Sequence, residues 1–413
     1  MNKRLLSIIG LIAACITILS QCVDSKASTQ DLRGPAFAGS ASCAGCHQNI
    51  VDSYHSTAHA NTSHPGNRQS IKGSFAPPDN VFTYSGDNRV VMEDKAGGLY
   101  QTSYIGGAMQ NSFPFDVAIG SGRKAQTYLY WLGGQFKQLP VSYFVPAHSW
   151  ANSPGFPATH PKFDRVIPST CFGCHSSMVG VKAVKQQGVT AVEEFEDNQI
   201  VYGIDCERCH GAAAEHVNFH QQHPKEKKAQ HIVRIAALSN QAKLDQCALC
   251  HSGLKATQQS MFNFKPGDAL TDYYYPDFTR SNKADEMDVH GNQYQLFTAS
   301  VCFRKSTAMN CSSCHNTHTT ERNNLPALSA KCQSCHAPAS TSFCTFKELP
   351  AATLAINCID CHMPLQASNK IALLTNGQQS PTPDMIRTHL IRIYPDETAR
   401  LLALLKKDSV GNR

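Results

Sequence analysis

The sequence lacks an apolar run long enough for an ordinary membrane-spanning helix, which needs about 20 apolar residues. The run at its start extends only from Leu5 to Leu19, and polar residues resume at Gln21. The positive charges of Lys3 and Arg4 precede this run. A basic start followed by a short apolar stretch is typical of an export signal, so we predict that the chain acts outside the cytoplasm.

Two cysteines interrupt this leader, and each ends a segment that resembles the lipobox of bacterial lipoproteins. Cys15 follows the better small residues, whereas Cys22 follows the better apolar length. We take residues 1–22 as signal peptide and lipobox with Cys22 as the lipidated residue, and residues 23–40, rich in Ser, Ala and Gly, as a linker. Lipidation at Cys15, an uncleaved anchor and ordinary cleavage further on are the alternatives. The expected location is the periplasm or outer membrane of a Gram-negative bacterium.

What the sequence has in abundance is the pattern Cys-x-x-Cys-His, which occurs seven times and uses fourteen of the 18 cysteines. The cysteines are Cys43, Cys46, Cys171, Cys174, Cys206, Cys209, Cys247, Cys250, Cys311, Cys314, Cys332, Cys335, Cys358 and Cys361. The histidines that follow them are His47, His175, His210, His251, His315, His336 and His362. We number the motifs one to seven in chain order.

This spacing suits one cofactor, haem c. Two thiols add to the two vinyl groups of one porphyrin while the next residue coordinates its iron, so seven covalently attached haems are predicted. Chance would give far fewer than one copy of the pattern. A structural zinc takes four ligands and does not explain a histidine after every cysteine pair.

Haem changes how composition and charge are interpreted. Roughly 190 residues for six haems, from Cys171 to His362, leave little polypeptide for conventional hydrophobic cores, so the porphyrins are expected to form the core. The formal net charge of +6 is balanced by haem propionates, and no nucleic-acid partner is expected.

The chain divides around the motifs. Residues 41–70 hold the first haem site, and residues 71–170 show period-two patterns and turn residues that predict a β-rich, haem-free subdomain. Residues 171–395 form the six-haem part, and residues 396–413 a C-terminal helix and tail. Within the six-haem part, the acidic stretch 192–197 is interpreted as a solvated helix face.

The motif contexts carry a family resemblance. The patterns at 206–216 (Cys-x-x-Cys-His-Gly-x-x-x-x-His), 311–318 (Cys-x-x-Cys-His-x-x-His) and 358–364 (Cys-x-x-Cys-His-Met-Pro) resemble multihaem cytochromes c related to tetrahaem nitrification carriers and hydroxylamine oxidoreductase. The resemblance implies bis-histidine haems in stacked and perpendicular pairs within a mainly helical fold. Together with the residue patterns above, it predicts a mainly α fold with haems as the core and a small β-rich subdomain between the first two sites. The sequence has no Cys-x-x-Cys-Lys motif, which argues against ammonia-forming nitrite reduction of the pentahaem type.

Twelve histidines lie outside the motifs and supply candidates for the second axial ligands. Our candidates are His59, His216, His318, His290, His389, His148 and His231. His55 lies one helical turn before His59 on the same face and is the alternative there. His216 and His318 follow their own motif histidines too closely to reach the opposite face of the same haem, so each is expected on a neighbouring iron.

The predicted function is single-electron transfer along closely spaced, mostly bis-histidine irons, with redox proteins of a respiratory chain as partners and a lipid anchor in the membrane. One rival is a multihaem oxidoreductase that acts on a small nitrogen or sulfur compound at one open iron. Another is a structural subunit that docks an enzyme through the β-rich part. Cys302 and Cys344 remain outside the motifs, and a disulfide between them is left open.

Overall fold

The structure is a computed structural model that describes residues 31–188, 190–276 and 283–411. The predicted signal peptide, including Cys15 and Cys22, lies outside the described residues. The α-helices are α2 (Ser40–His55), α3 (Ser169–His175), α4 (Cys206–His210), α5 (Ala214–Gln222), α6 (Asn240–His251), α7 (Gln293–Ala299), α8 (Val301–Lys305), α9 (Leu325–Gln333), α10 (Ala351–Ile356), α11 (Cys358–His362) and α12 (Pro395–Gly411). Short 3-10 turns include η1 (Val145–Ala147), η3 (Met261–Asn263) and η6 (Cys311–Ser313).

The strands form three antiparallel sheets. They are β1 (Ser63–Pro65), β2 (Val81–Thr83), β3 (Asn88–Lys95), β4 (Gly98–Ile105), β5 (Ala108–Pro114), β6 (Val117–Ile119), β7 (Ala125–Leu132), β8 (Gln135–Gln138), β9 (Val141–Phe144), β10 (Ser149–Asn152), β11 (Ser176–Gln187), β12 (Thr190–Tyr202), β13 (Leu365–Thr375) and β14 (Thr382–Arg387). The eight-stranded sheet has the order β1-β6-β7-β9-β10-β13-β14, with β8 beside β7. The four-stranded sheet runs β2-β3-β4-β5, and β11 pairs with β12.

The four-stranded and eight-stranded sheets share one apolar core. Met92 from the first and Tyr128 and Trp150 from the second are among its buried members. Alternating side chains on two facing sheets produce such a core, as the period-two pattern predicts. Trp150 is 2% exposed, and its indole nitrogen donates to the Ser74 carbonyl at 2.8 Å. A side chain at Gly73 would place its Cβ 2.0 Å from this indole.

The prediction of a mainly α fold is wrong. Helices account for 30% and strands for 27% of the protein, which makes it a mixed α/β structure. Strands are not confined to residues 71–170, because β13 pairs with β10 and extends the eight-stranded sheet with residues far along the chain. The acidic stretch 192–197 lies in β12, where Phe195 is buried, and is not a helix. Its pairing with β11 sets its conformation, and the local charge pattern does not reveal that partner.

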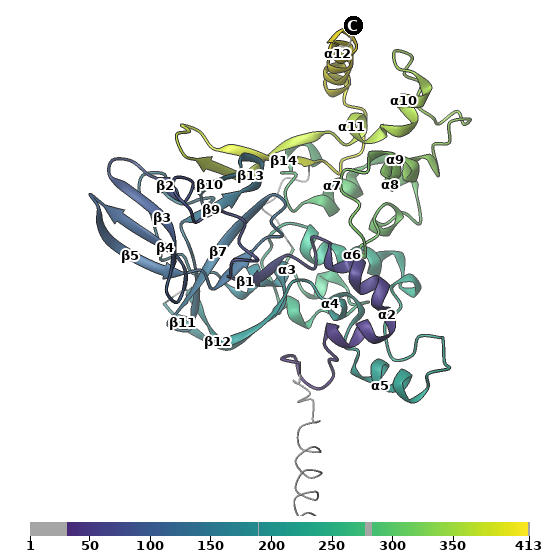
Figure 1. The fold of residues 1–413 in the computed structure, drawn as a ribbon. Coiled ribbons are helices and arrows are strands. Elements are labelled where there is room, and N and C mark those ends of the chain that lie inside the picture. Colours follow the sequence, from purple (N-terminus) through teal and green to yellow (C-terminus); the bar gives the residue numbers. More distant parts are fainter. Residues whose placement is uncertain (1–30, 189, 277–282, 412–413) are drawn as a thin grey trace, which may run out of the picture.

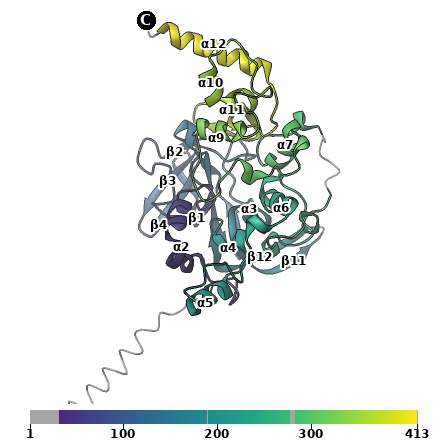
Figure 2. The same cartoon turned by 90° about the vertical axis from the view of Figure 1, so that its right-hand side faces the viewer.

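The two kinds of structure occupy different sides of the molecule (Figure 1). Strands β2 to β5 lie on one side, and the motif helices α3, α4 and α6 gather with α2 on the other. Helices α9 to α12 extend from one end of the helical part, and α5 lies at the opposite end. The view turned by 90° places α5 and α12 at opposite ends as well (Figure 2).

Apolar side chains also cluster among the motifs. Phe172 of α3 packs with Phe136 and Phe195, and Leu249 of α6 packs with Met261 and Tyr274. The expectation that porphyrins alone form the core of this part is therefore wrong. Within residues 31–188, 190–276 and 283–411, no helix is both long and apolar enough to cross a membrane.

Candidate haem-binding sites

The seven motifs lie on short helical turns. Motifs two, three and seven lie in the short helices α3, α4 and α11. Motif one lies within α2, and motif four forms the end of α6. Motif five begins with the turn η6, and motif six begins in the last turn of α9. Polar side chains cap several of these turns: Asp205 accepts from the Arg208 amide at 2.9 Å, and Asn310 accepts from the Ser312 amide at 2.9 Å. A helical turn places cysteines three positions apart on one face, as attachment to a single porphyrin requires.

Three motif histidines each face a histidine from a distant part of the chain. The His251 and His59 rings have centroids 6.0 Å apart, with planes at 79°. The His210 and His318 centroids are also 6.0 Å apart, at 19°. The third pair contains His315 and His389, 6.2 Å apart at 34°.

This separation fits a metal held between two imidazoles. With metal–nitrogen bonds of about 2 Å on opposite sides, the ring centroids of two ligands lie about 6 Å apart. The residues present therefore fit the iron of a haem at motifs three, four and five.

The histidine of motif two, His175, lies near a second histidine, His290. Desolvation, together with the charge of the nearby His290, lowers the pKa of His175 to about 4. Burial is also the main cause that lowers the pKa of His251 and of His389 to about 4. These imidazoles are therefore neutral at pH 7, which is the form that ligates a metal.

Other motif histidines are oriented by backbone carbonyls. Nδ1 of His336 lies 2.7 Å from the Ser342 oxygen, and Nδ1 of His362 lies 3.0 Å from the Arg392 oxygen. Nδ1 of His210 lies 3.4 Å from the Val233 oxygen. A carbonyl only accepts, so Nδ1 carries the proton and Nε2 presents its lone pair, as in metal-bound histidines.

The remaining candidate ligands have different surroundings. Nδ1 of His216 donates to the Gln230 oxygen at 2.7 Å, so its Nε2 is also available. His231 pairs with Glu215 at 3.0 Å. His148 is exposed after η1 with a left-handed backbone, φ 47°. Across the described part of the chain, no motif histidine ring packs against His148 or His231.

Cysteines of different motifs also meet. Four pairs of thiols, each joining two motifs, lie close enough together to shift each other's pKa: Cys43 with Cys206, Cys174 with Cys250, Cys247 with Cys311, and Cys332 with Cys358. Motifs one and three, two and four, four and five, and six and seven are thus direct neighbours.

Hydrogen bonds between motifs support the same arrangement. Gln246 of α6 donates to the Cys209 carbonyl at 2.6 Å and joins motifs three and four. Arg208 donates to the Gly173 carbonyl at 3.3 Å and joins motifs three and two. Ser329 of α9 accepts from the Cys358 amide at 3.1 Å and joins motifs six and seven.

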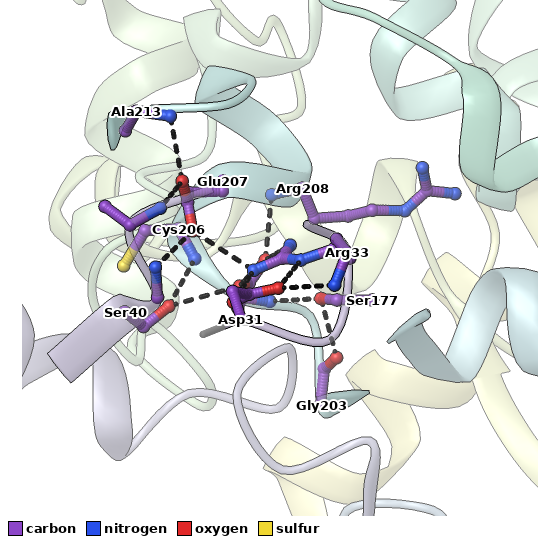
Figure 3. A network of polar contacts seen from close by, with 12 residues as sticks. Asp31, Arg33, Ser40, Ser177, Gly203, Cys206, Glu207, Arg208 and Ala213 are labelled. Atoms are coloured by element: carbon purple, nitrogen blue, oxygen red, sulfur yellow. Dashed lines mark hydrogen bonds and ion pairs between the residues drawn. The ribbon is translucent and has the colours of Figure 1, made fainter. Parts of the chain in front are cut away.

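A buried ion-pair network that the sequence did not suggest holds the start of the described chain against motif three (Figure 3). Arg33 donates to Asp31 at 2.8 Å, Asp205 at 2.7 Å and Glu207 at 3.1 Å, and all four side chains are at most 10% exposed. Glu207 also accepts from the amides of residues 38, 39 and 213. Residues 31–39, predicted as part of a linker, are therefore bound to the protein body. No local pattern in the sequence predicts these contacts.

Cys302 and Cys344 are each free of a disulfide in the structure. Among the described residues, no group of three or more His, Cys, Asp or Glu side chains is arranged to hold a metal ion. Haem needs no such group, because the porphyrin supplies four ligands and the protein at most two.

The comparisons with known proteins agree with this site chemistry. The family model for cytochrome c554 and c-prime matches residues 157–211, which contain motifs two and three. No curated protein and no solved structure matches the chain. The family match supports a multihaem c-type cytochrome that acts in electron transfer and carries covalently attached haem c.

Proposed function

We propose that this c-type cytochrome is exported, binds seven haems c and passes single electrons along them. The main support is that three motif histidines each face a second histidine. The ring centroids are 6.0 Å apart for His251 and His59, 6.0 Å for His210 and His318, and 6.2 Å for His315 and His389. Each of the three partner histidines comes from a segment that is far along the sequence from the motif it faces.

The second ligands lock different parts of the chain together. His318 follows motif five but serves motif three, and His59 follows motif one but serves motif four. The irons are thus cross-linked through the polypeptide. His290 serves motif two, and His216 serves motif one, since the Ala214 amide at the start of α5 donates to the Ala36 carbonyl at 3.0 Å close to that motif.

The motif contacts suggest an order for electron transfer. Motif one neighbours three, three neighbours four, and four neighbours five. The interaction of Cys332 with the charge of Cys314 links motif six to five, and Ser329 links six to seven. Motif two contacts both three and four, and so forms a side branch.

Haem supplies an iron that changes its charge by one unit, and the protein's residues keep that change easy. A histidine pair ligates both oxidation states, so few atoms move on transfer. The hydrogen bond from Nδ1 of His210 to the Val233 carbonyl fixes the orientation of that ring.

The leader motivates the rest of the proposal. We infer lipidation at Cys22, a location in the periplasm or outer membrane, and redox proteins of a respiratory chain as partners. Nucleic acid is not an expected partner. Attachment of haem c outside the cytoplasm agrees with the basic, apolar start of the chain.

The direct test counts haems and electrons on the purified protein. Mass spectrometry of the denatured chain is expected to show seven haem additions, and a reductive titration under inert gas is expected to take up seven electrons per chain. Fewer than seven haems, or haems that accept no electrons from each other, would contradict the proposal.

A further inference from the structure

Motifs six and seven differ from motifs three, four and five in what faces their histidines. Nδ1 of His336 donates to the Ser342 carbonyl, and Nδ1 of His362 donates to the Arg392 carbonyl, so each Nε2 keeps a free lone pair. In the described part of the chain, no histidine ring packs opposite either of them, whereas motifs three, four and five each have such a ring.

The nearby histidines are already engaged. All 19 histidines lie in the described residues, and six of them follow residue 283. Two of the six are His336 and His362 themselves. The other four are His290, which lies near His175, His318, which faces His210, and the facing pair of His315 and His389. The C-terminal part of the chain therefore has no spare histidine.

The other histidines belong to distant elements. His216, His220, His223 and His231 lie on α5 or in the loop after it, and α5 lies at the opposite end of the molecule from α9 to α11 (Figures 1 and 2). His223 and His231 are held locally by the Phe219 carbonyl at 3.0 Å and by Glu215 at 3.0 Å.

Those that remain lie on α2, β1 and the β-sheet loops. His55 is exposed at the end of α2, His148 is exposed after η1, and His160 lies beside the Thr159 hydroxyl at 3.1 Å. His64 lies in β1, paired with Ala118 of β6.

The two motifs form an accessible unit. The Cys332 and Cys358 thiols lie close enough to shift each other's pKa, and the Ser329 hydroxyl of α9 accepts from the Cys358 amide. Cys335 and His336 are exposed, whereas His175 of motif two is half-buried. Solvent-borne molecules therefore have access to this end of the protein.

We propose that the irons at motifs six and seven have no sixth ligand from the protein and bind small exogenous ligands there. This inference rests on the proposed haem occupancy of both motifs. The ligand class is a small molecule or anion with a carbon, nitrogen or sulfur lone pair, of the size of carbon monoxide, azide or nitrite. Electrons that arrive through motifs three, four and five would then end at a ligand-binding pair.

Two thiols outside the motifs, those of Cys302 and Cys344, lie near motifs six and seven and are candidate sixth ligands. Burial raises the pKa of Cys302, and the nearby Cys335 adds to this effect. Burial likewise raises the pKa of Cys361, and the nearby Cys344 adds to it. Neither cysteine belongs to a motif. A thiolate from either one, bound as sixth ligand, is the alternative that the experiment must separate.

The experiment uses the full-length protein after mass spectrometry has shown seven haems. Titration of the reduced protein with carbon monoxide is expected to show two binding equivalents per chain, and the oxidised protein is expected to show two equivalents of high-spin iron that azide converts to low spin. A His318→Ala variant should add a third equivalent at motif three, which calibrates the assay. A Cys332→Ala/Cys335→Ala variant, which lacks haem six, should lose one equivalent.

The failures are distinguishable. A missing haem by mass contradicts the proposed function. Seven haems with no carbon monoxide binding overturn the inference alone, as does binding that appears only in Cys302→Ser or Cys344→Ser variants, because a thiolate then closed the site. Two equivalents that persist after haem six is removed also overturn it.

Discussion

The imidazole rings of His59 and His251 meet at 79° with centroids 6.0 Å apart, although one follows motif one and the other completes motif four. His55, one turn before His59, is exposed at the end of α2. The structure thus distinguishes two histidines that a helical pattern treats alike.

This distinction predicts the effect of a single substitution. His59→Ala should convert one low-spin iron to high spin and add one carbon monoxide equivalent, because only His59 faces a motif histidine. His55→Ala is the matched control and should leave the absorption spectrum unchanged. Equal effects of both substitutions would contradict the assignment.

The angles between paired rings predict a spectroscopic difference among the irons. Nearly parallel ligand planes, as for His210 and His318 at 19°, separate two iron orbitals in energy and give a rhombic low-spin spectrum. Nearly perpendicular planes, as for His59 and His251, leave those orbitals close in energy and give a highly anisotropic spectrum. Paramagnetic resonance of the oxidised protein should contain both types. His318→Ala should remove a rhombic component, and loss of the anisotropic component would contradict this prediction.

The Arg33 network predicts a large loss of stability on its disruption. Glu207→Ala leaves three backbone amides without a buried acceptor and removes one of the three carboxylates that pair with Arg33, and removal of one member of a buried ion pair costs about 3–5 kcal/mol. Urea unfolding followed by haem absorbance measures the change. Asp94→Ala breaks the exposed pair with Arg68 and should cost less than about 1 kcal/mol. Similar losses for both variants would count against a structural role for the network.

The core of the two β-sheets predicts a second stability effect. Gly73→Ala would place a methyl group 2.0 Å from an atom of Trp150, inside contact distance. Overpacking of this kind costs about 1–3 kcal/mol. The melting temperature should fall while the haem spectrum stays the same, because the motifs lie outside this core. An unchanged melting temperature would mean that the indole moves aside freely.

The leader predicts attachment to a membrane. A Cys22→Ser variant should be released as soluble protein on cell fractionation, because the lipidated residue is lost. Retention of that variant, together with release of a Cys15→Ser variant, would move the lipid to Cys15.

The sequence alone determined the attachment chemistry. Two thiols and a histidine within five residues act locally, so the pattern identifies each predicted haem site without knowledge of the fold. The hairpin of β2 and β3 was also predictable, because strand residues and turn residues follow each other directly. The C-terminal helix, present as α12, was predictable from its own residues as well.

Only the tertiary structure decided which histidines meet. His389 lies opposite His315 because Ser300 donates to the His389 carbonyl at 3.0 Å and holds the segment after β14 against α8. The β13 strand joins β10 through the same kind of long-range contact, which is why the mainly α prediction failed. Pairings between distant segments depend on the complete set of packing and hydrogen-bond energies, and no local pattern of residues encodes them.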